Sequence, residues 1–131
     1  IASLHHALIR GVQVEILVPF HTDFQITDDL NRYYFRILEK LGARCLWSKE
    51  MNHAKVMLID ERVGTVGSQN LDALSFDWNT EAGIFFEDVK MVHKLTAIVT
   101  SWKDSAFPFD PASISPLRWY GSFLMWFVRK L

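Results

Sequence analysis

Residues 53–70 read HAKVMLIDERVGTVGSQN, in which two apolar runs flank the pair Glu61-Arg62. The runs, residues 54–60 and 63–67, are rich in valine and other aliphatic residues, which favour strands. We expect the two runs to form an antiparallel hairpin joined by a two-residue turn at Glu61-Arg62. The turn lacks the Gly or Asn that is typical of such a connection, so the sequence does not mark its length directly. The pairing register given below assumes a turn of two residues.

The predicted hairpin gathers polar side chains at one end. With a two-residue turn, Lys55 faces Ser68 and His53 faces Asn70, while Asp60 lies at the far end on the opposite face. Alternate side chains of a strand share a face, and so do cross-strand partners. An imidazole, an ammonium, a hydroxyl and a carboxamide are therefore expected to meet at one end of an otherwise apolar hairpin.

These groups suit the binding of a phosphoryl group. Lys55 supplies a cation, Asn70 a directed N–H donor and Ser68 a hydroxyl, and Gly67 allows close approach of the backbone. His53 is suited to act as nucleophile or proton donor near neutral pH. The alternative is a polar rim without catalytic role, and spacing alone leaves both interpretations open. No second His or Cys lies nearby and Lys55 would repel a cation, so we expect no metal and no other cofactor.

The remaining pattern alternates strands with helices, which predicts an α/β or mixed α+β fold, a mixed β-sheet flanked by helices. We divide the chain into a domain over 1–105 and a segment over 106–131 that holds a Pro-rich loop and an aromatic C-terminal helix. The expected helices cover residues 3–9, 27–41, 88–102 and 117–131, and the further strands cover 12–18, 43–47 and 80–87. Thr27 is expected to cap the second helix, and Gly42 to end it.

Composition excludes several classes of protein. Of the 131 residues, 50% are hydrophobic and 22% are charged, so the chain is not a disordered tail. The net charge of −1 gives no sign of a nucleic-acid partner. The single cysteine, Cys45, lies in an apolar stretch and is expected to be a reduced core thiol. The chain begins at Ile1 inside a predicted helix, so we expect it to be part of a longer protein that carries any membrane anchor elsewhere.

The pattern His53-x-Lys55-x4-Asp60-x6-Gly67-Ser68-x-Asn70 resembles the HKD signature of the phospholipase D superfamily. The resemblance implies a phospholipase D-like half with a single HKD motif. It assigns attack on phosphorus and phosphate binding to the His and Lys of the motif, and completion of the oxyanion site to its Ser and Asn.

Two carboxylates complete the implied set of site residues. The family's Asp corresponds to Asp60, which we interpret as structural because the hairpin places it far from the polar end. The family also carries a Glu eleven residues after the motif's Asn, which orients the catalytic imidazole. That residue is Glu81 here, and its alternative is a solvated carboxylate at the start of a strand.

Residues 70–81 resemble bacterial cardiolipin synthases, especially the type-B form, and residues 11–19 and 33–42 look like the C-terminal half of such an enzyme, so the resemblance covers about residues 1–103. This implies phosphatidyl transfer from phosphatidylglycerol, with release of glycerol, through a phosphohistidine at the bacterial cytoplasmic membrane. Those enzymes contain two HKD halves, so the second half is expected from the missing N-terminal part or from a homodimer. The chain alone is expected to be inactive unless it dimerises.

Two alternatives stay open. A homodimeric phosphodiesterase or nuclease of the same superfamily is the other enzyme class, although the net charge argues against a nucleic-acid substrate. The predicted helix over 117–131 carries Trp119 and Trp126 with basic residues near its ends. This pattern is typical of peripheral membrane contact, and equally of packing against a partner half.

Overall fold

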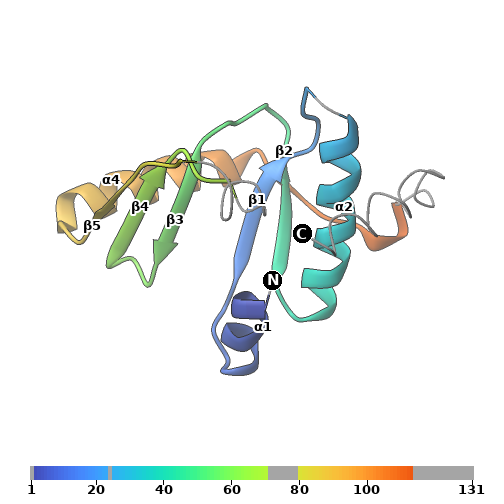
Figure 1. The fold of residues 1–131 in the computed structure, drawn as a ribbon, viewed down its shortest axis with the longest axis horizontal. Coiled ribbons are helices and arrows are strands. Elements are labelled where there is room, and N and C mark those ends of the chain that lie inside the picture. Colours follow the sequence, from blue (N-terminus) through green and yellow to red (C-terminus); the bar gives the residue numbers. More distant parts are fainter. Residues whose placement is uncertain (1, 24, 71–79, 114–131) are drawn as a thin grey trace. The chain divides into compact units, whose positions relative to one another are not determined.

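The computed structural model describes residues 2–23, 25–70 and 80–113, and it combines helices with β-strands (Figure 1). The chain divides into two compact units, one formed by the described residues up to Asn52 and from Lys103 onward, the other by those of His53–Trp102. The fold is mixed α/β, as the sequence predicts. The elements are α1 (Ala2–Ile9), β1 (Glu15–Pro19), α2 (Gln25–Lys40), β2 (Arg44–Ser48), β3 (Lys55–Ile59), β4 (Val63–Gly67), β5 (Gly83–Phe86), α4 (Val89–Asp104), β6 (Phe107–Pro108) and a 3-10 turn (Pro111–Ser113).

The first unit contains a three-stranded sheet in the order β1-β2-β6. Strands β1 and β2 run parallel, with Glu15 opposite Arg44, and the connection between them is the helix α2. A helical crossover is the usual way to join parallel strands, because a tight turn cannot reverse the chain twice. The Arg44 guanidinium also donates to the Glu15 carboxylate at 2.8 Å, which adds a cross-strand ion pair to the register.

Aromatic residues fill the core of the first unit. The ring of Phe35 on α2 lies 4.6 Å from that of Trp47 on β2 and 5.6 Å from that of Phe109, measured between centroids. Cys45 on β2 is completely buried among them. Such offset and edge-on ring contacts stabilise a core beyond the burial of their area. The helical spacing of Phe35 and Leu38 explains why this face of α2 is the buried one.

Two boundaries in the first unit correct the sequence prediction. Helix α2 begins at Gln25 rather than after a cap at Thr27. Asp28 in its first turn is 5% exposed and accepts a hydrogen bond from the amide of Thr22 at 2.8 Å, so it secures the preceding loop. Strand β6 was missed: Phe107–Pro108 pairs with β2, but a two-residue strand with proline gives no period-2 signal.

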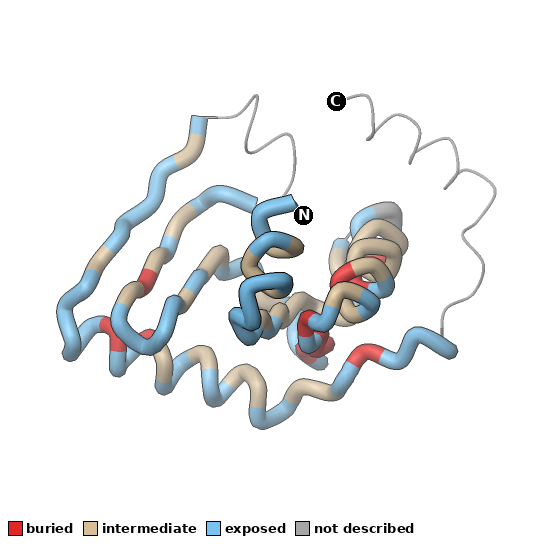
Figure 2. The backbone as a smooth tube through the Cα atoms, turned by 90° about the horizontal axis from the view of Figure 1, so that it is seen from below, coloured by how far each residue is buried: buried red, intermediate tan, exposed pale blue. Residues whose placement is uncertain are grey.

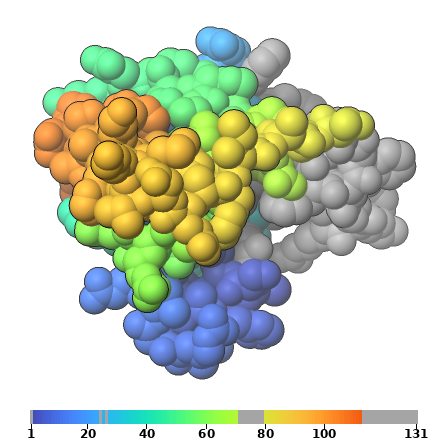
Figure 3. Space-filling model, turned by 90° about the vertical axis from the view of Figure 1, so that its left-hand side faces the viewer, coloured from blue at the N-terminus to red at the C-terminus, as the bar shows by residue number. Residues whose placement is uncertain are grey.

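The second unit contains the antiparallel sheet β3-β4-β5 and α4, which begins as predicted after Asp88 (Figure 1). The Asp88 carboxylate accepts a hydrogen bond from the Met91 amide at 2.9 Å, which is the contact that an N-cap residue makes. Val92 and Leu95 are the buried residues of α4, and Figure 2 shows few other buried positions in this unit. In Figure 3, α4 (gold) and β5 before it (yellow) form one continuous surface. The predicted helix over 117–131 lies outside the described residues.

Candidate phosphate site

The hairpin predicted from the sequence is present, but its register differs by one residue. Ile59 pairs with Val63 and Lys55 pairs with Gly67, so three residues connect β3 to β4. The predicted pairing of Lys55 with Ser68 is therefore wrong, and the ladder ends before it would reach His53. The cause lies in the connection, where Asp60 and Glu61 both adopt left-handed backbone, with φ of 52° and 53°.

The polar residues still lie at one end of the hairpin, but the predicted shared face is not kept, because Lys55 now shares its face with Gly67 rather than with Ser68. Lys55 begins β3 and Gly67 ends β4, so both lie at the same end of the hairpin. Strand β5 brings Gly83 opposite Gly67, which places Glu81 and Ala82 at this end too. The third strand of the sheet thus carries the predicted carboxylate to the hairpin's polar end.

Ser68 and the segment before β5 are joined by a set of hydrogen bonds. The Ser68 hydroxyl donates to Oε2 of Glu81 and accepts the amide of Ala82 at 3.0 Å. The Ser68 amide donates to the carbonyl of Ala82 at 2.9 Å. The Glu81 side chain is thereby held at the end of β4, close to the other motif residues in the fold.

Lys55 and His53 are linked through the backbone. The Lys55 ammonium donates to the carbonyl oxygen of His53 at 2.8 Å, and His53 itself is exposed two residues before β3. Asn70 is exposed three residues after β4. His53 and Asn70 are therefore both accessible to a ligand.

The structure shows why residue 67 is a glycine, which the sequence did not reveal. A methyl group built on its Cα would lie 2.8 Å from the carbonyl oxygen of Ala82 and 3.0 Å from Cα of Gly83. Both atoms belong to the backbone of the neighbouring segment and cannot rotate away. Glycine at 67 therefore permits the close approach of β4 to β5, in addition to any approach of a ligand that the sequence suggested. The pair Ala82-Gly83, small residues directly after Glu81, was the signal for this approach.

Asp60 lies at the other end of the hairpin, as predicted. It directly follows β3, whose four residue-to-residue steps from Lys55 to Ile59 span about 13 Å at the rise of a strand. Asp tolerates left-handed backbone better than most residues, because its short polar side chain can bond locally. This accounts for Asp60 as a residue of the turn.

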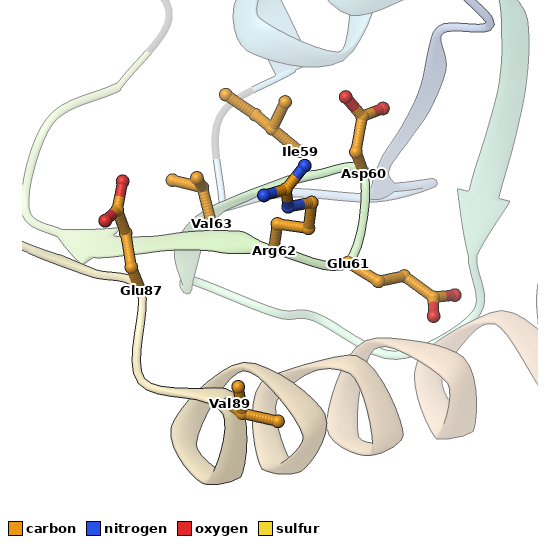
Figure 4. Close-up of a pocket in the computed structure, with 7 residues that line it drawn as sticks. All are labelled: Ile59, Asp60, Glu61, Arg62, Val63, Glu87 and Val89. Atoms are coloured by element: carbon orange, nitrogen blue, oxygen red, sulfur yellow. The ribbon is translucent and has the colours of Figure 1, made fainter.

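A hollow of about 450 Å³ lies at this far end (Figure 4). Asp60, Glu61 and Arg62 of the connection line it, together with Glu87 and Val89 from the segment after β5. Its charged lining includes three carboxylates, so a phosphate would meet repulsion there. The hollow is thus separate from the site at the polar end of the hairpin.

The other residues with chemical potential are the candidate metal ligands and the cysteine. In the described part of the chain, no three His, Cys, Asp or Glu residues gather so that they could hold a metal ion. Burial raises the pKa of the Cys45 thiol to about 12, with a smaller contribution from the negative charge of Glu39. Cys45 is therefore a neutral core thiol at physiological pH, as predicted.

Comparison with known families identifies the family of the chain. Residues 1–102 match the family described as "Cardiolipin synthase, PLD-like domain". The chain belongs to this family. A solved structure of a phospholipase D family member, Nuc from Salmonella typhimurium, has the same fold: its TM-score is 0.66, with 18% identity over 82% of this chain and 71% of Nuc.

Cardiolipin synthases are also the relatives found by sequence. The chain is 35% identical over 96 residues to "Probable cardiolipin synthase YwiE" of Bacillus subtilis, which covers 72% of this chain and 19% of that protein. It is 36% identical over 93 residues to cardiolipin synthase 1 of Bacillus cereus, which covers 70% of this chain and 18% of that protein. The PLD-like chain thus spans about a fifth of the length of these relatives. None of the helices among the described residues is long and apolar enough to cross a membrane.

Proposed function

We propose that this chain supplies one half of a phosphatidyl transferase that makes cardiolipin from two molecules of phosphatidylglycerol. The observation that carries the proposal is the contact between Ser68 and Glu81 at the end of the hairpin where Lys55 begins β3, with His53 and Asn70 in the adjoining residues. Family membership supports the same activity, because the match includes every one of these positions.

In the first step, a ring nitrogen of one histidine attacks phosphorus and forms a P–N bond. The P–O bond to the leaving glycerol breaks, and a second histidine donates a proton to the departing oxygen. In the second step, the acceptor lipid's hydroxyl gives its proton back to that second histidine and attacks phosphorus. The P–N bond breaks, so the net reaction yields cardiolipin and free glycerol.

The chain's own residues would have distinct tasks in these steps. His53 is one of the two reacting histidines, and Lys55 and Asn70 bind the phosphoryl oxygens, whose charge grows as the bond to the nucleophile forms. Glu81 orients the imidazole of His53. Asp60 stays outside this chemistry because it lies in the turn at the far end.

The second histidine comes from another half. Attack and departure take place on opposite faces of phosphorus, and a single imidazole reaches only one of them. We propose that an N-terminal half of the longer protein, or a second copy related by a two-fold axis, brings the other motif to the exposed end of this hairpin. The lipid substrates place the reaction at the bacterial cytoplasmic membrane, with the enzyme bound peripherally or facing the cytoplasm.

The test is a turnover assay with the longer protein that contains this chain. Vesicles of phosphatidylglycerol should yield cardiolipin and one glycerol for each cardiolipin formed, while a single-stranded oligonucleotide stays intact. Cleavage of the oligonucleotide without formation of cardiolipin would contradict the proposal and favour the homodimeric phosphodiesterase.

A further inference from the structure

The hydroxyl of Ser68 is surrounded by polar groups of one short segment. It donates to the carboxylate of Glu81, accepts the amide of Ala82 at 3.0 Å, and lies 3.3 Å from the carbonyl oxygen of Ala82. A serine hydroxyl has one proton to give. An ionised carboxylate can only accept, so the proton lies between Ser68 and Glu81, or on the longer path to the Ala82 carbonyl.

A phosphodiester presents only acceptor oxygens, and each needs a donor from the protein. Bonds to a carboxylate are stronger than bonds between neutral groups, so the Glu81 contact competes well for the Ser68 proton. We infer that Ser68 acts as a positioning residue that holds Glu81, and that it does not bind the phosphate of the substrate. The inference rests on the proposed function and reassigns one residue of its site.

The backbone holds Ser68 and Glu81 in register. Gly67 pairs with Gly83, and the next bond along the ladder joins the Ser68 amide to the Ala82 carbonyl at 2.9 Å. The side-chain contact therefore lies directly beside a backbone ladder, which keeps the main chains of the two residues next to each other.

This arrangement leaves Glu81 able to serve His53. A carboxylate has two oxygens with about four acceptor positions, so binding the Ser68 hydroxyl at Oε2 does not prevent it from accepting an imidazole N–H as well. A carboxylate with a restricted direction orients its partner better than a freely rotating one. The phosphate donors are then Lys55 and Asn70.

Turnover by the longer protein tests the positioning role. We expect S68A to lower kcat by about 10- to 100-fold with little change in KM, the size of effect that removal of an orienting partner has at other sites. S68T keeps the hydroxyl and should recover most of this loss. E81Q should cause a similar loss of kcat. The double variant S68A/E81Q should have a kcat within about twofold of that of E81Q, because both substitutions break the same hydrogen-bonded pair. Multiplication of the two losses would contradict the inference.

Binding of inorganic phosphate to the longer protein that contains this chain separates this inference from the proposed function. S68A should bind phosphate within about twofold of the unsubstituted protein, whereas K55A should bind at least tenfold more weakly. Equal losses in S68A and K55A would overturn the positioning role and leave the phosphate site intact. Failure of the unsubstituted longer protein to bind phosphate would overturn the phosphate site itself, and the inference with it.

Discussion

Substitution of Gly67 by alanine should disturb the junction between β4 and β5 while the same change at Gly83 is tolerated. The two glycines face each other across the ladder. At Gly67 the added methyl group meets backbone atoms at 2.8 and 3.0 Å, but at Gly83 the nearest atoms lie at 3.6 and 3.7 Å, an ordinary van der Waals contact. The pair forms a matched comparison within one row of the sheet.

The magnitude follows from two opposing terms. Overpacking costs about 1–3 kcal/mol where the neighbours cannot move aside. Both substitutions also gain roughly 0.5–1 kcal/mol, because alanine loses less conformational freedom than glycine on folding. This gain cancels in the comparison, so the unfolding free energy of Gly67→Ala should lie about 1–3 kcal/mol below that of Gly83→Ala.

Native-state hydrogen exchange at the amides of β4 is the suitable assay, since the chain has two compact units that need not unfold together. Exchange in β2 of the first unit provides the internal control and should not change. Equal opening free energies for Gly67→Ala and Gly83→Ala would refute the claim that Gly67 permits close approach of the strands. In the longer protein, Gly67→Ala should also slow turnover, because the strand shift separates Ser68 from Glu81.

Three other predictions concern separate parts of the chain. Glu61 has a φ of 53°, so Glu61→Asn should raise the unfolding free energy by roughly 0.5–1 kcal/mol in urea denaturation, and a decrease would mean that the turn is not left-handed there. The pKa of Cys45 is raised to about 12, so the stability that its neutral thiol contributes is complete below the pKa of an unfolded thiol. The unfolding free energy should fall as pH rises from about 9 to 12, by at most about 1.4 kcal/mol per pH unit. This dependence on pH should disappear in Cys45→Ala. Turnover by the longer protein should persist in EDTA, because a site of His, Lys, Ser and Asn supplies its own charge stabilisation; a loss that Mg²⁺ restores would contradict this.

The comparison between sequence and structure shows which signals were sufficient. The two apolar runs predicted β3 and β4 correctly, because both are rich in aliphatic residues that favour strands and are separated by a short polar connection. The register could not be predicted, because Asp60 and Glu61 adopt left-handed backbone without the Asn-Gly signal that marks such turns.

The site was predicted in composition more accurately than in its contacts. Hairpin spacing predicted that His53, Lys55 and Asn70 lie at one end of the hairpin, and the structure has them at that end; their catalytic roles rest on the resemblance and stay a prediction. The bond between Ser68 and Glu81 could not be predicted, because it depends on how closely β5 approaches β4. That approach in turn requires glycine at 67, because a side chain there would meet the backbone of residues 82 and 83, which are distant in the sequence.

The central claim is that His53 reacts directly in phosphatidyl transfer, and the most direct measurement is the rate of cardiolipin formation by His53→Ala beside His93→Ala in the longer protein. His93 is an exposed histidine on α4 that lies outside the motif, so its replacement controls for the general effect of losing an imidazole. We predict that His53→Ala lowers the rate by at least about 10²- to 10⁴-fold with no loss of folded structure, because the reaction loses its nucleophile or general acid. His93→Ala should remain within about twofold of the unsubstituted enzyme. Cardiolipin formation by His53→Ala at a rate close to that of His93→Ala would contradict the assignment of this hairpin as the reacting site.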